Sequence, residues 1–334
     1  MTGLVFVTQQ VDPEHPVLGA TVPKIRALAT RFDEVAVLAA AAVDGVLPEN
    51  CHVRLYGSDS RVQRGRLYTA ALRDELKRKP AAVLVHMTPL LSVLARPVTR
   101  GRTPLLLWFT HWKPSRTLVL AERTSSAVLT VDRKSFPLAS AKVVAIGHGI
   151  DLAPFGCVER APTDRLRVVA LGRTSPAKGY ETIVRAAAFA GVELELRGPS
   201  FTEEEHAERR RLEALGARFE EAVPYAEVPG LLAAKDVLVN NMREGALDKV
   251  VYEAAATCMP VLASNSGFAE LLPPDLRFQR DDPSDLAEKL RALADADRNA
   301  IGRELRARVE QRHSVEHWAD EVYAVALHHR ETPG

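Results

Sequence analysis

The chain has 334 residues, of which 46% are hydrophobic, enough for two domains with separate cores. Its 44 Lys and Arg residues nearly balance 43 Asp and Glu residues, so no bulk charge favours a nucleic-acid partner. The first apolar run lacks a basic segment before it, and no run approaches the roughly 20 residues that cross a bilayer. We therefore expect neither a signal peptide nor a membrane-spanning helix.

The three cysteines are widely separated and fit neither a metal-ligand spacing nor an even disulfide set. This usage predicts unpaired cysteines in a reducing compartment, and therefore a cytoplasmic protein.

Seven short apolar segments in the first half each have the length of one β-strand. Several are apolar throughout, as expected for parallel strands that are covered on both faces. The helix after the first of them should begin near Thr21, with Pro23 in its first turn. The predicted strands are Leu4–Val7, Val35–Ala39, Val53–Tyr56, Ala82–Val85, Leu105–Phe109, Ala127–Thr130 and Val143–Ile146.

Two loops of this half follow predicted strands and are candidates for ligand contact. Residues 12–20 follow the first strand, and Gly19 would allow close approach of a ligand to the backbone. His111 lies among aromatic residues after another strand, where a packed histidine and a ligand contact are about equally expected. No G-x-G-x-x-G motif follows the first strand, which disfavours a dinucleotide-binding oxidoreductase.

The segment from Arg61 to Lys79 has seven basic side chains, with Tyr68, Leu72 and Leu76 at helical spacing. A basic amphipathic helix of this kind can lie on an anionic membrane. It can also be a solvated helix whose apolar face covers a sheet. Both interpretations stay open, with the second more common.

The second half repeats the strand-and-helix pattern after a Pro-rich, aperiodic segment at residues 152–164, which suits a linker. A strand is followed by a turn that contains Arg173, Lys178 and two glycines. A cation at a helix start opposes the helix dipole, so we expect a bound anion such as a diphosphate there. The predicted strands are Leu166–Leu171, Val192–Leu196, Arg218–Ala222, Val237–Asn240, Val261–Ala263 and Arg277–Gln279.

The segment Arg243–Ser264 predicts a polar loop, a short amphipathic helix and a buried strand. Asp248 is placed to cap the helix, whose free N–H groups would form an anion site. Glu253, one turn further on, can hold sugar hydroxyls or can simply lie on a solvated helix face.

Four segments, in this order and at these separations, resemble the retaining glycosyltransferases of family 4. They are IGHGID (Ile146–Asp151), LGRTSPAKGYETIVRA (Leu171–Ala186), VPYAEVPGLLAAKDVLVNN (Val223–Asn241) and EAAATCMPVLASNSGFAELL (Glu253–Leu272). The resemblance implies the GT-B fold: an α/β protein with two Rossmann-like domains, parallel sheets and a cleft between the domains. The corresponding boundaries are 1–151 for the acceptor-side domain, 152–165 for the linker, 166–312 for the nucleotide-sugar domain and 313–330 for a helix that packs back on the first domain.

The resemblance also implies sugar transfer from a nucleoside-diphosphate sugar to a hydroxyl acceptor such as a lipid, polysaccharide or natural product, without metal or cofactor. Arg173 and Lys178 would bind the diphosphate and stabilise its growing charge. His111 would contact the donor sugar, and Glu253 the ribose. Donor contacts are also expected from Gly19, Tyr225, Glu244, Asp248 and Lys249.

The sequence departs from the family pattern near its paired glutamates. The position eight residues before Glu253 is Gly245, with Glu244 one residue earlier. Asp248 and Lys249 stand where small apolar residues often present amides to the phosphates. An Asp there would repel a diphosphate unless it caps the helix and the lysine compensates.

Three functions therefore remain in competition. The leading one is a retaining glycosyltransferase in the cytoplasm, with a peripheral membrane contact as an open option. The second is a non-catalytic GT-B protein that binds a nucleotide sugar, which the missing first glutamate keeps open. The third, an NAD-type oxidoreductase, lacks its glycine motif and is the least favoured.

Overall fold

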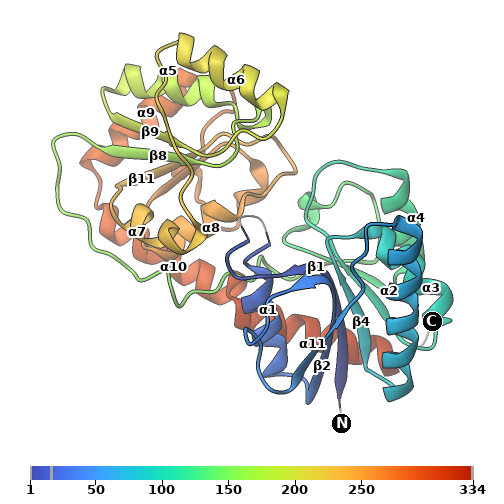
Figure 1. The fold of residues 1–334 in the computed structure, drawn as a ribbon. Coiled ribbons are helices and arrows are strands. Elements are labelled where there is room, and N and C mark those ends of the chain that lie inside the picture. Colours follow the sequence, from blue (N-terminus) through green and yellow to red (C-terminus); the bar gives the residue numbers. More distant parts are fainter. Residues whose placement is uncertain (1, 16–17, 332–334) are drawn as a thin grey trace. The chain divides into compact units, whose positions relative to one another are not determined.

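The structure, a computed structural model, describes residues 2–15 and 18–331. The chain forms two compact units (Figure 1). The first unit comprises residues 1–151 together with residues 312–334, and the second comprises residues 152–311.

The first unit is built on a seven-stranded parallel sheet in the order β3-β2-β1-β4-β5-β6-β7. The strand order reverses beside β1, which places the carboxyl ends of β1 and β4 at a topological switch point. All seven predicted strands are present. They are β1 (Gly3–Val11), β2 (Glu34–Ala42), β3 (Cys51–Leu55), β4 (Ala82–His86), β5 (Leu105–Trp108), β6 (Ala127–Thr130) and β7 (Val143–Ala145).

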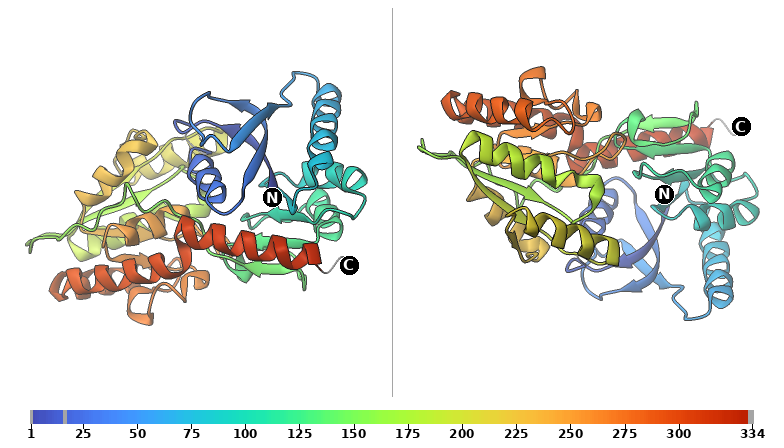
Figure 2. Two further views of the ribbon diagram at one scale, coloured as in Figure 1. Left: turned by 90° about the horizontal axis from the view of Figure 1, so that it is seen from below. Right: turned by 90° about the horizontal axis from the view of Figure 1, so that it is seen from above.

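Helices cover both faces of this sheet, because alternate residues of a strand point to opposite faces. Val85 and Leu107 belong to the core cluster that also contains residues of α2, α3 and α4. Trp108, the next residue on β5, instead packs edge-to-face on Trp318 of α11, with ring centroids 5.5 Å apart. α11, drawn in red in Figure 2, lies beside α1. These helices are α1 (Thr21–Ala29), α2 (Arg61–Glu75), α3 (Pro89–Thr99), α4 (Arg116–Thr124) and α11 (Val315–Glu331).

The second unit has a five-stranded parallel sheet in the order β10-β9-β8-β11-β12. Figure 1 shows α5, α6 and α9 on one side of it and α7, α8 and α10 on the other. The strands are β8 (Arg167–Leu171), β9 (Glu193–Arg197), β10 (Phe219–Glu220), β11 (Val237–Asn240) and β12 (Val261–Ala263). The helices are α5 (Tyr180–Ala190), α6 (Glu203–Ala214), α7 (Val228–Ala233), α8 (Lys249–Ala256), α9 (Pro283–Asp295) and α10 (Arg298–His313).

The predicted strand Arg277–Gln279 is wrong. Only a single bridge pairs Arg277 with Ala263, and the chain then turns at Asp281, whose φ is 60°. The prediction rested on a short polar-flanked segment, and one bridge is too little pairing for a strand.

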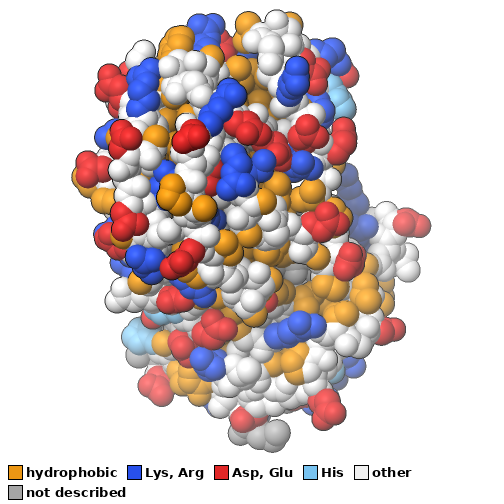
Figure 3. Space-filling view, turned by 90° about the vertical axis from the view of Figure 1, so that its left-hand side faces the viewer, with side chains coloured by type: hydrophobic (Ala, Val, Ile, Leu, Met, Phe, Trp, Pro, Cys, Tyr) orange, Lys and Arg blue, Asp and Glu red, His pale blue; other side chains and the backbone are white. Residues whose placement is uncertain are grey.

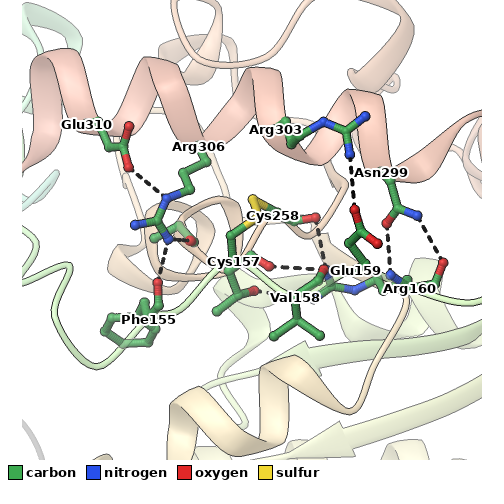
Figure 4. Close-up of a disulfide and its surroundings, with 12 residues drawn as sticks. Phe155, Cys157, Val158, Glu159, Arg160, Cys258, Asn299, Arg303, Arg306 and Glu310 are labelled. Carbon is green, nitrogen blue, oxygen red and sulfur yellow. Dashed lines mark hydrogen bonds and ion pairs between the residues drawn. A yellow bond between two sulfur atoms is a disulfide. The ribbon is translucent and has the colours of Figure 1, made fainter.

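The prediction that the cysteines stay unpaired is also wrong, because Cys157 and Cys258 form a disulfide with Cα atoms 4.9 Å apart (Figure 4). The two residues are 101 positions apart, so spacing alone could not pair them. The segment after the first unit turns back along the end of α8. There the Val158 N–H donates to the Thr257 carbonyl, and Arg160 Nη1 donates to the Cys258 carbonyl at 2.9 Å.

The basic segment predicted after β3 is α2. Tyr68 and Leu72 are fully buried on the sheet, so its apolar face is covered within its own unit. Membrane contact by its remaining basic face stays a prediction. None of the helices described is both long and apolar enough to span a bilayer. On the face drawn in Figure 3, basic and acidic side chains are interspersed and form no large patch of one sign.

Candidate functional site

The carboxyl end of β8 opens into the turn that the sequence predicted to bind a diphosphate. Ser175 accepts a hydrogen bond from the Ala177 N–H and so begins the short helix η3 (Pro176–Lys178). Gly172 has a φ of 126°, and a Cβ there would lie 2.4 Å from Lys178 Nζ. A glycine is therefore required at this position so that the Lys178 amine can fold back over the end of the strand.

The Lys178 amine is the centre of a polar cluster. It donates to the Leu171 carbonyl at 3.1 Å and pairs with Asp248 Oδ2 at 2.5 Å. Asn240, the last residue of β11, donates to the same carboxylate oxygen at 2.7 Å. Only 10% of the Lys178 side chain is exposed, so this ion pair is shielded from most of the solvent.

Asp248 therefore does something different from what the sequence predicted. It occupies the N-cap position of α8, but its side chain makes no capping hydrogen bond. Its carboxylate instead holds Lys178 and Asn240. The predicted repulsion between Asp248 and a diphosphate is consequently not relieved by helix capping.

Glu253 is buried on α8, with 2% of its surface exposed, so its interpretation as a solvated helix residue is wrong. The Tyr225 hydroxyl donates to Glu253 Oε1 at 2.7 Å, and Lys249 Nζ pairs with the same oxygen at 2.7 Å. Lys249 Nζ also lies 3.7 Å from the centroid of the Tyr225 ring, a cation–π contact. The structure thus joins three predicted donor-binding residues in one cluster.

Glu244, by contrast, does not join either cluster in the second unit. Its carboxylate accepts hydrogen bonds from the Ser266 N–H and hydroxyl, both at 2.8 Å. Gly245, which follows it, has a φ of 79°. The loop therefore turns at the position that corresponds to the first glutamate of the glycosyltransferases that the sequence resembles, and Glu244 stabilises the start of η5 (Ser266–Phe268).

Arg173 lies on the same turn as Lys178 but is far more open. Its side chain is 57% exposed, and its Nη1 is 3.4 Å from Glu205 Oε1. Glu205 is itself held by the Phe201 and Thr202 N–H groups at the start of α6. Because the contact is long and Arg173 is exposed, the guanidinium is able to turn toward an anion.

The remaining predicted residues, Gly19 and His111, belong to the first unit. A Cβ at position 19 would lie 2.7 Å from the Pro13 carbonyl oxygen, so the loop's own backbone requires glycine there. His111 follows the carboxyl end of β5, accepts a hydrogen bond from the Lys113 N–H and stacks on Trp112. The residue is exposed.

Sequence reasoning missed two polar residues at strand ends. One is Asn240, described above, whose only signal is a pair of asparagines directly after a buried strand. The other is His86, the last residue of β4, which is buried and whose Nδ1 has no hydrogen-bond partner among the residues described. Burial, with a smaller effect of Lys24, lowers the pKa of His86 to about 3, so its ring is neutral at pH 7.

The part of the chain that the structure describes gives no sign of a metal centre. Within residues 2–15 and 18–331, no three His, Cys, Asp or Glu side chains are grouped so that they could hold a metal ion.

With this geometry in place, comparisons with known proteins show what the chain resembles. Residues 173–324 match the family described as Glycosyl transferase-like, and the match begins at Arg173 and includes both polar clusters of the second unit. A comparison of the sequence with curated proteins found no match.

Solved structures share the fold over nearly the whole chain. A sucrose-phosphate synthase from Thermosynechococcus elongatus has a TM-score of 0.74 at 19% identity, covering 97% of this chain and 98% of that one. A glycosyltransferase from Rickettsia africae has a TM-score of 0.75 at 13% identity, covering 98% of each. Anabaena HepE, in complex with UDP and glucose, has a TM-score of 0.72 at 19% identity, covering 97% and 99%. The predicted GT-B fold, with two Rossmann-like α/β units, is confirmed.

Proposed function

We propose that this protein is a retaining, metal-independent glycosyltransferase. It transfers a sugar from a nucleoside-diphosphate sugar to a hydroxyl group of a lipid, polysaccharide or natural-product acceptor. The Glycosyl transferase-like match over residues 173–324 supports sugar transfer as the general activity. The assignment to the retaining family 4 rests on the sequence segments quoted above.

The observation that carries the proposal is the position of Lys178. Its largely buried amine lies over the carboxyl end of β8, where ligands bind in open parallel sheets. Arg173 is on the same turn and exposed, so the two cations can approach a diphosphate together. Such cations stabilise the charge that grows on a leaving diphosphate as its bond to the sugar breaks.

The reaction would proceed as follows. The bond between the anomeric carbon and the diphosphate oxygen breaks, while a bond forms from the acceptor oxygen to the same carbon on the same face. The acceptor proton passes to an oxygen of the leaving diphosphate. Lys178 and Arg173 lower the barrier because the charge they neutralise is greater in the transition state than in the substrate.

Asp248 sets a condition on donor binding. In the structure it already neutralises Lys178, so a diphosphate must displace this carboxylate or share the amine with it. The Tyr225–Lys249–Glu253 cluster is satisfied internally in the same way, and we assign it to the ribose side of the donor.

A thermal-shift panel with UDP, GDP, ADP, dTDP, NAD and NADP at about 1 mM tests the proposal. UDP is the first choice because HepE is known in complex with UDP. We expect stabilisation by one nucleoside diphosphate, lost in the Arg173→Ala/Lys178→Ala double variant. The matched control is Arg66→Ala/Arg73→Ala, which removes the same charge from exposed positions on α2. Stabilisation by NAD alone would overturn the proposal.

The second candidate is a non-catalytic nucleotide-sugar-binding protein. It is favoured by the ion pair of Asp248 with Lys178 and by the turn at Gly245. It predicts the same stabilisation but no release of nucleoside diphosphate from any nucleotide sugar with any acceptor. A turnover assay therefore separates the two functions, with nucleotide sugars of the same nucleoside diphosphate that stabilises the protein. Addition of EDTA to that assay tests metal independence.

A further inference from the structure

A polar pocket lies in the first unit, away from the carboxyl ends of its strands. It has a volume of about 440 Å³, within the range of small-molecule sites. Pro104, Ser126 and Lys142 line it, and each directly precedes one of the strands β5, β6 and β7. The pocket is therefore at the amino ends of these strands, the opposite edge from the predicted ligand loops.

The lining of this pocket is strongly cationic. Arg96, Arg102, Arg123 and Lys142 contribute four positive charges, and His329 of α11 also lines the pocket. None of the described residues that line the pocket carries a carboxylate. The guanidinium of Arg96 lies over the turn at Gly101, the residue before Arg102: a Cβ on Gly101 would be 3.4 Å from Arg96 Nη1.

Helix ends explain only part of this charge. The pocket lies at the carboxyl ends of α3 and α4, and each helix end carries roughly half a negative charge. Lys142 satisfies one of them, because its amine donates to the carbonyls of Glu122, Arg123 and Ser125. About one negative charge in total is set against four positive ones, so the three arginines are left in excess.

The arginines also differ from those of a comparable pocket in the second unit. That pocket, of about 450 Å³, contains Arg185 and Arg211, and both guanidinium groups pair with Glu181 at 2.6 Å. Arg96, Arg102 and Arg123 make no side-chain hydrogen bond or ion pair with any residue that the structure describes. Like charges gathered without a counter-ion repel each other, and an anion relieves that repulsion.

We propose that this pocket binds a soluble small molecule that carries a phosphate or pyrophosphate group. Arginine suits such a group because its planar fork donates two parallel hydrogen bonds to phosphate oxygens. Ser126 adds a further donor: its Oγ accepts from the Leu105 N–H, which leaves the hydroxyl proton for the ligand. The site is independent of the donor site proposed above, since all of its residues belong to the first unit.

Calorimetric titration with inorganic pyrophosphate tests the proposal. It is done on the full-length Arg173→Ala/Lys178→Ala protein, in which the proposed donor site is removed, so that failure of one proposal does not affect the other. We expect saturable binding that weakens at least tenfold when Arg102→Ala and Arg123→Ala are added. The matched control, Arg66→Ala/Arg73→Ala, removes the same charge from the same unit and should change the affinity less than about twofold.

Three results would overturn the proposal. Equal weakening by the pocket and control substitutions would mean that only net charge matters. Absence of binding at about 10 mM pyrophosphate would mean that the arginines are solvated cations at helix ends. Binding to vesicles of anionic phosphatidylglycerol without binding of pyrophosphate would identify a lipid headgroup surface in place of a soluble-ligand site.

Discussion

The substitution Asp248→Asn tests how the carboxylate that pairs with Lys178 affects donor binding. In the structure Asp248 Oδ2 lies 2.5 Å from Lys178 Nζ and 2.7 Å from Asn240 Nδ2. A diphosphate oxygen that binds the same amine would lie roughly 4 Å from this carboxylate. Two like charges at that distance repel by about 4 kcal/mol at an effective dielectric constant of about 20.

Solvent reduces this repulsion, because 23% of the Asp248 side chain is exposed. If one third of it remains, its removal strengthens binding by about 1.4 kcal/mol, or tenfold. The free protein loses a charge-assisted hydrogen bond worth about 1.5–3 kcal/mol. Asp248→Asn should therefore bind the nucleoside diphosphate about tenfold more tightly and yet unfold at lower denaturant concentration.

Calorimetric titration and urea unfolding measure the two effects, with Asp275→Asn as the matched control at an exposed position of the same unit. Weaker binding by Asp248→Asn would refute the reasoning, because it would show that Asp248 holds Lys178 in its binding position. Unchanged binding would show that the diphosphate does not approach this amine.

Three further predictions concern other parts of the chain. Glu244→Gln should leave the affinity for nucleoside diphosphate within about twofold of the wild-type value in calorimetry, because the Glu244 carboxylate holds Ser266 and reaches neither polar cluster. A loss of affinity above about tenfold would contradict this prediction. Reduction of the Cys157–Cys258 disulfide should lower the unfolding free energy of the second unit by up to about 4 kcal/mol in urea titrations, since it closes a loop of 101 residues; Cys157→Ser should abolish the dependence on reductant. The first unit should lose stability as the pH falls from about 6.5 toward 3, because burial lowers the pKa of two of its histidines to about 3. These are His86 and His313, the last residue of α10, which falls within residues 312–334 of the first unit; unfolding midpoints at pH 7 and pH 5 that agree would contradict the prediction.

The positions of the strands, and the division into two strand-and-helix units, could be predicted from short apolar segments of the sequence. Parallel strands covered on both faces are apolar throughout, so segments such as Leu105–Phe109 and Val237–Asn240 stand out from their surroundings. The prediction of a strand at Arg277–Gln279 was wrong because a strand also needs a partner strand over several residues. Three residues of sequence do not specify such pairing.

The local arrangement of the candidate site was predictable where one turn carries several of its residues, as with Arg173, Lys178 and the glycines between β8 and α5. It was not predictable where the contact joins distant elements. The pairing of Lys178 with Asp248 spans 70 residues, and the cysteine pairing spans 101. Such contacts depend on how the elements pack, and a single sequence does not report that packing.

Release of nucleoside diphosphate from a panel of nucleotide sugars, with lipid and polysaccharide acceptors, tests the central claim most directly. The account predicts turnover with at least one donor, and a loss of more than tenfold in the Arg173→Ala/Lys178→Ala variant. The control variant Arg66→Ala/Arg73→Ala should keep wild-type activity toward polysaccharide acceptors, which need no membrane contact by α2. A variant whose turnover stays within tenfold of wild type, a loss of no more than about 1.4 kcal/mol, would contradict the role of these cations.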